Sequence, residues 1–298
     1  MTPGPGNAAS GAPPLCHPLA INGLNLVVYE WPGEGDPILL VHATGFHARC
    51  WRAVIERLPG RHVFAVDMPS HGASDNKPPP YSWSHFGDDL AAVTEALDLR
   101  RVVGVGHSMG GYALVLAVAR LPQRFRALML VDPVITGPEL ARGLHLTAME
   151  HPVARRRRHW DSPEQMFQWF SAKAPYARWD PVVLRDYCNF GLVPAGDGQG
   201  FELACPPDLE AEIYVSMRMG DIYAAIATIG VPVEIIRARA RRADESRFSF
   251  SASPTWEHVS GLFRNARDEQ LPDHSHFIPM EIPGWMARRI AAFADRDD

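Results

Sequence analysis

Cysteine is scarce in this 298-residue sequence, and the four cysteines are far apart. No C-x-x-C spacing occurs among Cys16, Cys50, Cys188 and Cys205, which argues against both a metal-binding knuckle and a disulfide framework. This usage fits a reducing compartment, so we expect a cytoplasmic protein. The sequence also lacks a metal-ligand cluster, a dinucleotide fingerprint and a phosphate-binding loop, and it therefore implies no cofactor.

Long apolar runs and a strong net charge are missing as well. No stretch is long enough to span a bilayer, so no membrane span is expected. Residues 1–18 are rich in Pro, Gly and Ala, lack the basic and apolar segments of a signal peptide, and are predicted to be a disordered tail. The net charge of −5 gives no reason to expect nucleic acid or an anionic membrane as a partner.

Apolar runs of strand length alternate with segments of helical length in the first half of the chain. Asn22-Gly23 between two apolar runs predicts a β-hairpin. Further strands are expected at residues 37–42, 62–67, 102–105 and 127–131, with helices at about residues 51–58, 84–97 and 112–119. This alternation predicts an α/β fold with a mainly parallel sheet flanked by helices.

The alternation breaks after Asp132-Pro133. The next hundred or so residues are rich in Trp, Phe, Tyr, Arg and Pro and contain no strand-like run of comparable strength. We predict that residues 134–230 form an inserted helical cap and that residues 19–133 and 231–298 form the core. In the second part of the core, strands are expected at residues 231–236 and 268–271, and helices at residues 254–263 and 281–294.

The chemistry is expected at Gly106-His107-Ser108-Met109-Gly110, where a buried strand turns sharply into a helix. In this context a Gly-x-Ser-x-Gly pattern exposes the serine hydroxyl at the carboxyl edge of the sheet. Gly106 and Gly110 avoid a collision of Cβ atoms with the neighbouring strand and helix. Ser108 is therefore the predicted nucleophile.

A serine hydroxyl is a weak nucleophile at neutral pH and needs a base that an acid orients. His276 is the predicted base, because it lies in a loop between the last predicted strand and the last predicted helix. His274 is the alternative. The backbone N–H groups of Met109 and Thr44 are the predicted donors to the oxyanion. The Thr44 side chain either adds a hydrogen bond or only shapes its turn.

Taken together, these motifs resemble the α/β-hydrolase superfamily, in particular its capped serine esterases and C–C bond hydrolases. The matching stretches are His42-Ala-Thr-Gly45, Asp67-Met-Pro-Ser-His-Gly72-Ala-Ser74, Gly106-His-Ser108-Met-Gly-Gly111 and Ser275-His276-Phe-Ile-Pro-Met-Glu281. The resemblance implies the α/β-hydrolase fold and a Ser–His–acid triad. It does not imply the substrate, because this fold hosts many chemistries. A serine nucleophile argues against haloalkane dehalogenases and epoxide hydrolases, which have an aspartate there.

The sequence departs from the family pattern at the acid. The commonest acid follows the strand at 231–236 in a Gly-x-x-Asp pattern, and Arg241 stands at that position here. Asp132 ends the strand after the nucleophile's, a position that some relatives use. Asp244 lies in the usual loop but is displaced by three positions (244 − 241 = 3). We favour Asp132, although an Asp-Pro at that strand end also occurs in relatives whose acid is elsewhere.

The predicted function is cofactor-free hydrolysis of a carboxylic ester through an acyl-enzyme, with Ser108 as nucleophile, His276 as base and Asp132 as acid. The aromatic residues of the predicted cap indicate a small-molecule ester with an apolar acyl or alkyl group. A lactonase or a C–C bond hydrolase would use the same residues. A non-catalytic small-molecule receptor is the alternative of another class, because some receptors on this fold keep the triad.

Overall fold

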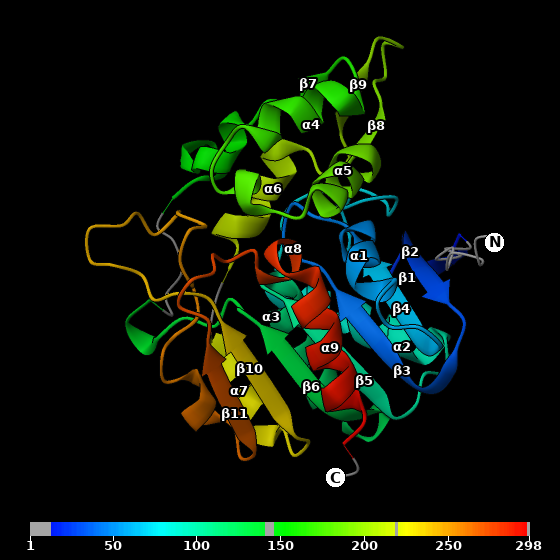
Figure 1. The fold of residues 1–298 in the computed structure, drawn as a ribbon, viewed down its shortest axis with the longest axis vertical. Coiled ribbons are helices and arrows are strands. Elements are labelled where there is room, and N and C mark those ends of the chain that lie inside the picture. Colours follow the sequence, from blue (N-terminus) through cyan, green and yellow to red (C-terminus); the bar gives the residue numbers. More distant parts are fainter. Residues whose placement is uncertain (1–12, 141–145, 218–219, 297–298) are drawn as a thin grey trace, which may run out of the picture.

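A computed structural model of the protein describes residues 13–140, 146–217 and 220–296. An eight-stranded sheet forms its centre (Figure 1). The strand order is β1 (Leu15–Ile21), β2 (Leu24–Trp31), β4 (Arg61–Asp67), β3 (Glu34–Val41), β5 (Val102–His107), β6 (Phe125–Val131), β10 (Val233–Arg237) and β11 (Ala266–Gln270). The β1–β2 and β2–β4 pairs are antiparallel and the other pairs of this sheet are parallel. The prediction of a mainly parallel α/β sheet is confirmed.

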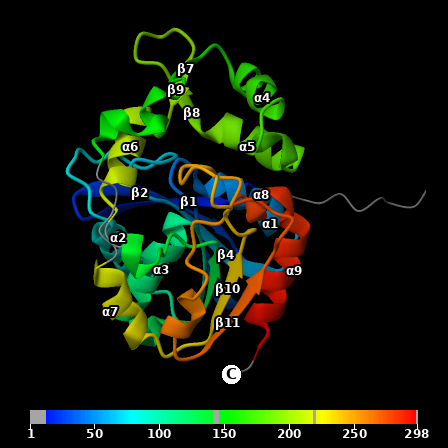
Figure 2. The same ribbon diagram turned by 90° about the vertical axis from the view of Figure 1, so that its left-hand side faces the viewer.

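Alternate residues of the central strands face opposite sides of the sheet, and each side packs on its own helices. In β3, Leu39 and Val41 join the cluster beneath α2 (Trp83–Ala96), α3 (Met109–Arg120) and α7 (Gly220–Thr228). Ile38 and Leu40 join the cluster beneath α1 (Arg52–Ile55) and α9 (Pro283–Ala294). Figure 2 shows these helices on the two sides of the sheet. Burial on both faces is the reason that the central strands are continuous apolar runs.

The structure differs from several of the predictions. The helix expected at about residues 51–58 is α-helical only at Arg52–Ile55, after a 3-10 turn at Ala48–Trp51. Strand β1 begins at Leu15, inside the predicted disordered tail, because residues 15–18 pair antiparallel with residues 27–30 of β2. Residues 1–12 of that tail lie outside the described residues. The predicted helix at 254–263 is wrong for most of its length, because only a short 3-10 turn, Val259–Leu262, forms there. Outside this turn the backbone bonds to other segments; the Trp256 N–H, for example, donates to the Ile135 carbonyl at 2.9 Å.

The chain between β6 and β10 builds a second layer above the carboxyl edge of the sheet (Figures 1 and 2). This layer contains α4 (Pro163–Ser171), α5 (Pro181–Phe190), α6 (Pro207–Val215) and a small sheet of β7 (His159–Trp160), β9 (Phe201–Leu203) and β8 (Leu192–Pro194). Helix α7 falls within the predicted cap range, 134–230, but packs on α3 beside the main sheet. A cap with these boundaries stays a prediction.

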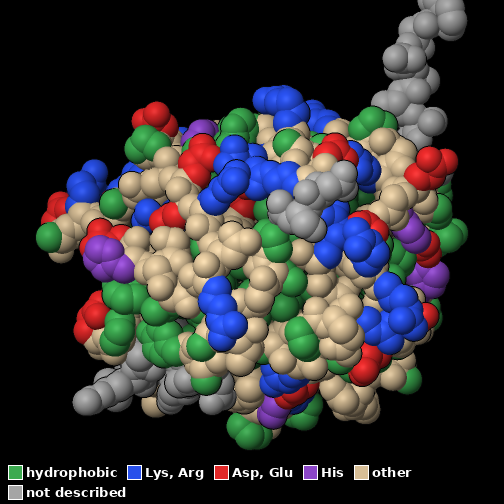
Figure 3. Space-filling view, turned by 90° about the horizontal axis from the view of Figure 1, so that it is seen from below, with side chains coloured by type: hydrophobic (Ala, Val, Ile, Leu, Met, Phe, Trp, Pro, Cys, Tyr) green, Lys and Arg blue, Asp and Glu red, His purple; other side chains and the backbone are tan. Residues whose placement is uncertain are grey.

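Side chains of different character are interspersed on the face seen in Figure 3, where acidic, basic and hydrophobic groups alternate. This mixture agrees with the modest net charge of −5. Within the ranges that the structure describes, no helix combines the length and the apolar character that crossing a membrane requires.

Candidate active site

Ser108 lies at the junction of β5 and α3 in a backbone conformation that side-chain-bearing residues seldom adopt, with φ +57° and ψ −116°. Two glycines permit this tight turn. A Cβ atom on Gly106 would lie 2.5 Å from the carbonyl carbon of Gly110, and one on Gly110 would lie 2.4 Å from the carbonyl oxygen of Val41. Both contacts are far inside van der Waals distance, so these positions require glycine. The turn therefore places Ser108 at the N-terminus of α3.

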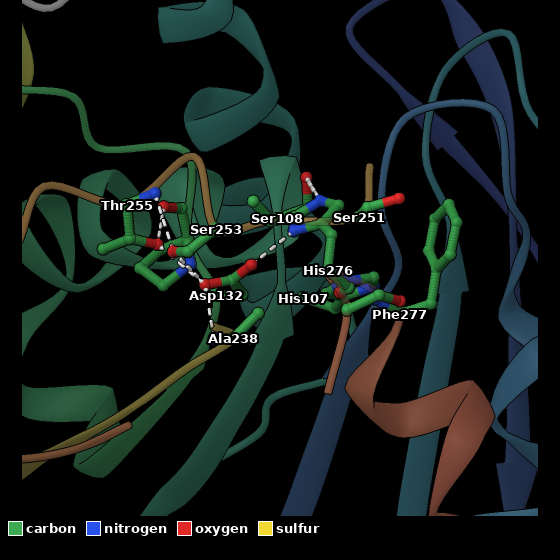
Figure 4. Close-up of polar contacts among 12 residues, drawn as sticks. His107, Ser108, Asp132, Ala238, Ser251, Ser253, Thr255, His276 and Phe277 are labelled. Atoms are coloured by element: carbon green, nitrogen blue, oxygen red, sulfur yellow. Dashed lines mark hydrogen bonds and ion pairs between the residues drawn. The ribbon is translucent and has the colours of Figure 1, made fainter. Parts of the chain in front are cut away.

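Three residues from separate parts of the fold form a continuous hydrogen-bonded chain (Figure 4). The Nε2 atom of His276 lies 2.9 Å from the Oγ atom of Ser108. The Nδ1 atom of His276 lies 2.6 Å from the Oδ2 atom of Asp132, a residue 144 positions away in the sequence. All three side chains are buried. The structure thus brings together the predicted nucleophile, base and acid, and a chain of this kind can move a proton from the serine to the imidazole.

Hydrogen-bond donors surround the other oxygen of Asp132. Its Oδ1 atom accepts from the Ala238 N–H at 3.0 Å and from the Ser253 hydroxyl at 2.5 Å. The Thr255 hydroxyl lies 3.3 Å from the same oxygen but donates its proton to the closer Pro133 carbonyl, at 2.6 Å. These donors replace the water that the fully buried carboxylate has lost. The sequence did not predict Ser253 and Thr255, because they lie in an irregular loop with no motif to mark them.

Asp244 and His274, the alternative acid and base, are not part of the hydrogen-bonded chain of Ser108, His276 and Asp132. The side chain of Asp244 is 81% exposed and forms an ion pair with Arg242. The Nδ1 atom of His274 contacts the Oε2 atom of Glu281 at 2.9 Å. Arg241, at the commonest acid position of the family, donates to backbone carbonyls, namely those of Ser246, Ser249 and Ala252.

Two backbone contacts fix the loop that carries His276. The Nε2–H of His107 donates to the His276 carbonyl at 2.8 Å, and the His276 N–H donates to the Phe250 carbonyl at 3.0 Å. Burial, and after it the neighbouring His276, hold the pKa of His107 well below the usual range. His107 is therefore a neutral donor at physiological pH. The sequence placed it inside the serine motif but did not indicate this contact.

The predicted oxyanion donors lie next to the nucleophile's strand. Met109 follows Ser108 as the first residue of α3, and Thr44 lies in the loop after β3, the strand adjacent to β5. Both residues are buried. The Thr44 hydroxyl has no hydrogen-bond partner in the part of the chain that the structure describes. That the two backbone N–H groups bind an oxyanion stays a prediction.

Two buried histidines anchor the loop that contains Thr44. The Gly45 N–H donates to the Nε2 atom of His71 at 2.9 Å, and the Met68 N–H donates to the Nε2 atom of His42 at 3.0 Å. Each accepting nitrogen must be unprotonated for these bonds to form. Burial lowers the pKa of His71 to about 4 and holds that of His42 well below its usual range.

We expect the protein to lose stability between pH 6.5 and pH 4, in part through His71. The pKa of His71 is about 4 in the folded state and about 6.5 when unfolded, so the unfolded chain binds more protons in this window. The contribution is complete above pH 6.5 and is lost as the pH falls, by at most about 1.4 kcal/mol per pH unit. Thermal unfolding followed from pH 7.5 to 4 measures the effect.

The variant His71→Gln is the control, because its side-chain amide can accept from the Gly45 N–H without titrating. Its unfolding free energy should depend less on pH than that of the wild type, and an unchanged pH dependence would exclude His71 as a contributor.

A cavity of about 210 Å³ opens onto Ser108 and His276. Apolar side chains form much of its wall, among them Val134, Val153, Met217, Phe248, Phe250 and Pro254. Among the aromatic residues of the predicted cap, Tyr214 lines the cavity, whereas Tyr176 and Trp179 pack with Phe277 in a buried cluster that adjoins the wall residue Phe250. Polar groups are also present in the wall, including His151, Tyr214, Arg241 and Arg247.

Comparison with known proteins identifies the family of this chain. The family described as "Alpha/beta hydrolase family" matches residues 38–294. An uncharacterized protein of Mycobacterium tuberculosis is 32% identical over 122 residues, which are 41% of this chain and 36% of that protein. A non-heme chloroperoxidase of Streptomyces lividans is 35% identical over 117 residues, which are 38% of this chain and 42% of that protein. The chain thus spans well under half of the length of these two relatives.

A solved structure, that of E-2-(acetamidomethylene)succinate hydrolase, has the same fold. It superposes with a TM-score of 0.74 at 20% identity and covers 95% of this chain and 99% of its own. At that identity the likeness concerns the fold. Together with the family match it confirms the predicted α/β-hydrolase fold.

Proposed function

This chain belongs to the alpha/beta hydrolase family, and from that premise we propose that it is a serine hydrolase of carboxylic esters that acts through an acyl-enzyme. One observation carries the proposal: the hydrogen-bonded chain of Ser108, His276 and Asp132 ends, at the serine, in a mostly apolar cavity. The cavity volume of about 210 Å³ is below the roughly 300 Å³ at which drug-sized sites begin, which favours a small substrate.

In the first half of the proposed reaction, the Oγ atom of Ser108 attacks the ester carbonyl carbon while its proton passes to the Nε2 atom of His276. Asp132 accepts a hydrogen bond from Nδ1 and stabilises the imidazolium that forms. The carbonyl oxygen becomes an oxyanion, for which the N–H groups of Met109 and Thr44 are the donors. The intermediate then expels the alcohol, which takes the proton from Nε2, and the acyl group stays on Ser108.

The second half repeats these steps with water. His276 removes a proton from a water molecule, and the resulting hydroxide attacks the acyl carbon. The second tetrahedral intermediate expels the Ser108 oxygen, which regains its proton from His276, and the carboxylic acid leaves. His107 contributes as a positioning residue, because its bond to the His276 carbonyl holds the imidazole between Ser108 and Asp132.

Turnover of short-chain chromogenic esters tests the proposal. We expect the purified protein to release 4-nitrophenol from 4-nitrophenyl acetate and butyrate, and a serine-directed fluorophosphonate to stop the reaction after labelling one site per chain. Mass spectrometry of the labelled protein should place the adduct on the peptide that contains Ser108. Ligand binding without turnover or labelling would instead favour the small-molecule receptor.

A further inference from the structure

Two positively charged side chains line the cavity at Ser108, and the hydrolysis of a simple neutral ester does not require them. Arg241 and Arg247 line it together with Ser108 and His276, and none of its described wall residues is an aspartate or a glutamate. We propose that these two arginines form an anion-binding subsite and that the substrate is an ester that bears a free carboxylate group. This inference rests on the proposed function and names its class of substrate.

The guanidinium of Arg241 is held in place without being neutralised. Its Nη1 donates to the Ser246 carbonyl, and its Nη2 lies 3.2 Å from the Ser249 carbonyl oxygen and 3.4 Å from that of Ala252. These contacts use three of the five N–H groups of an arginine and leave two for a ligand. Carbonyl oxygens orient the group but carry no formal charge, so the full positive charge remains at the cavity wall. Burial lowers the pKa of Arg241, and the carboxylates of Glu245 and Asp132, which do not form an ion pair with it, oppose this shift in part.

The acidic side chains of the same loop are engaged elsewhere. Glu245 pairs with Arg239 and lies 3.4 Å from the Nη2 atom of Arg242. Asp244 also faces Arg242, at 3.5 Å. Among the residues that the structure describes, neither Arg241 nor Arg247 forms an ion pair. The loop therefore neutralises the arginines that point away from the cavity and leaves the two cavity arginines for an anion from outside.

Arg247 places a second positive charge at the same wall. Its guanidinium carbon lies 5.1 Å from the centroid of the Phe248 ring, which also lines the cavity. Burial lowers the pKa of His151, and the positive charge of Arg247, another residue of the cavity wall, lowers it further. His151 stacks on Tyr214, with ring centroids 4.8 Å apart, and is uncharged at neutral pH.

These features match an ester with a carboxylate at one end and an apolar spacer between. The N–H groups of a guanidinium form charge-assisted hydrogen bonds to a carboxylate, and these are stronger than bonds between neutral groups. With the ester carbonyl at Ser108, the spacer lies along apolar walls such as Val153 and Phe250. Two cations and no carboxylate are among the described residues that line the cavity, so an anionic substrate is attracted there and a cationic one is repelled.

A matched pair of chromogenic esters tests the subsite: the 4-nitrophenyl monoester of adipic acid, which has a free carboxylate, and its methyl ester, which is neutral. We expect kcat/KM of the wild-type protein to be at least about tenfold higher for the acid, a preference that declines as salt screens the charges. Arg247→Gln should reduce the ratio of the two kcat/KM values by about tenfold, and Arg241→Lys, which keeps the charge but not the directed guanidinium N–H groups, by less. The control is Arg242→Gln, which removes the same charge from a 69% exposed side chain of the same loop and should keep the wild-type ratio.

Binding to Ser108→Ala separates this inference from the proposed function, because it needs no turnover. Calorimetry should show monomethyl adipate binding more tightly than dimethyl adipate. If both 4-nitrophenyl esters resist hydrolysis but this binding preference holds, the proposed function fails and the subsite stands. A wild-type kcat/KM ratio near one together with equal binding of the two adipates overturns the subsite. An equal loss of preference in Arg242→Gln and Arg247→Gln overturns it too.

Discussion

Replacing Ser108 with alanine should lower ester turnover by on the order of a millionfold, the usual cost of losing the nucleophile of such a triad. The hydroxyl is the only group at this position that can form the acyl-enzyme. Its Oγ atom faces the Nε2 atom of His276 at 2.9 Å and the cavity beyond. Steady-state hydrolysis of 4-nitrophenyl butyrate by wild-type and variant protein measures the loss.

The fold should survive this change. The side chain contributes one described hydrogen bond, and the net contribution of such a bond to stability is about 1 kcal/mol. Circular dichroism and the melting temperature of Ser108→Ala should therefore stay close to those of the wild type. Ser171→Ala, at the exposed end of α4, is the matched control and should keep full turnover. Undiminished hydrolysis by purified Ser108→Ala would refute the assignment of the nucleophile.

Asp132→Asn should lower turnover by about ten-thousandfold with the fold intact, as the same substitution does in serine proteases. The donors around Asp132 dictate how an asparagine would sit. The Ala238 N–H and the Ser253 hydroxyl both donate to Oδ1, so the amide oxygen must occupy that position. The amide NH₂ then faces the Nδ1 atom of His276 and favours the tautomer with its proton on Nε2. That tautomer cannot accept the proton of Ser108.

Asp244→Asn is the control for this substitution, because it makes the same chemical change in the other candidate acid. Its side chain is 81% exposed and pairs with Arg242, so turnover should change little. Comparison of kcat for the two variants between pH 6 and 9 decides between them. A large loss in Asp244→Asn with full activity in Asp132→Asn would show that the acid lies on the loop after β10.

Local patterns were sufficient for the main features of the core. The hairpin at Asn22-Gly23 and the apolar runs of β3 to β6 depend on turn chemistry and on burial on both faces, which neighbouring residues reveal. The turn at Ser108 could be predicted for the same reason, because the two glycines that permit it stand two positions away on either side. The start of β1 was missed, because its pairing with β2 outweighs a tail-like composition.

The choice between two acids, by contrast, required the tertiary structure. Asp132 and His276 are 144 positions apart, and their approach to 2.6 Å depends on the parallel order of β6, β10 and β11, which no local pattern specifies. The same holds for Ser253 and for the cavity wall that contains Arg241. From the sequence alone, Arg241 could be recognised as a departure from the usual acid position but not as a residue of the cavity wall. The folded loop turns it toward backbone carbonyls and the cavity, because hydrogen bonds within this irregular loop, rather than residue type, determine where its charge lies.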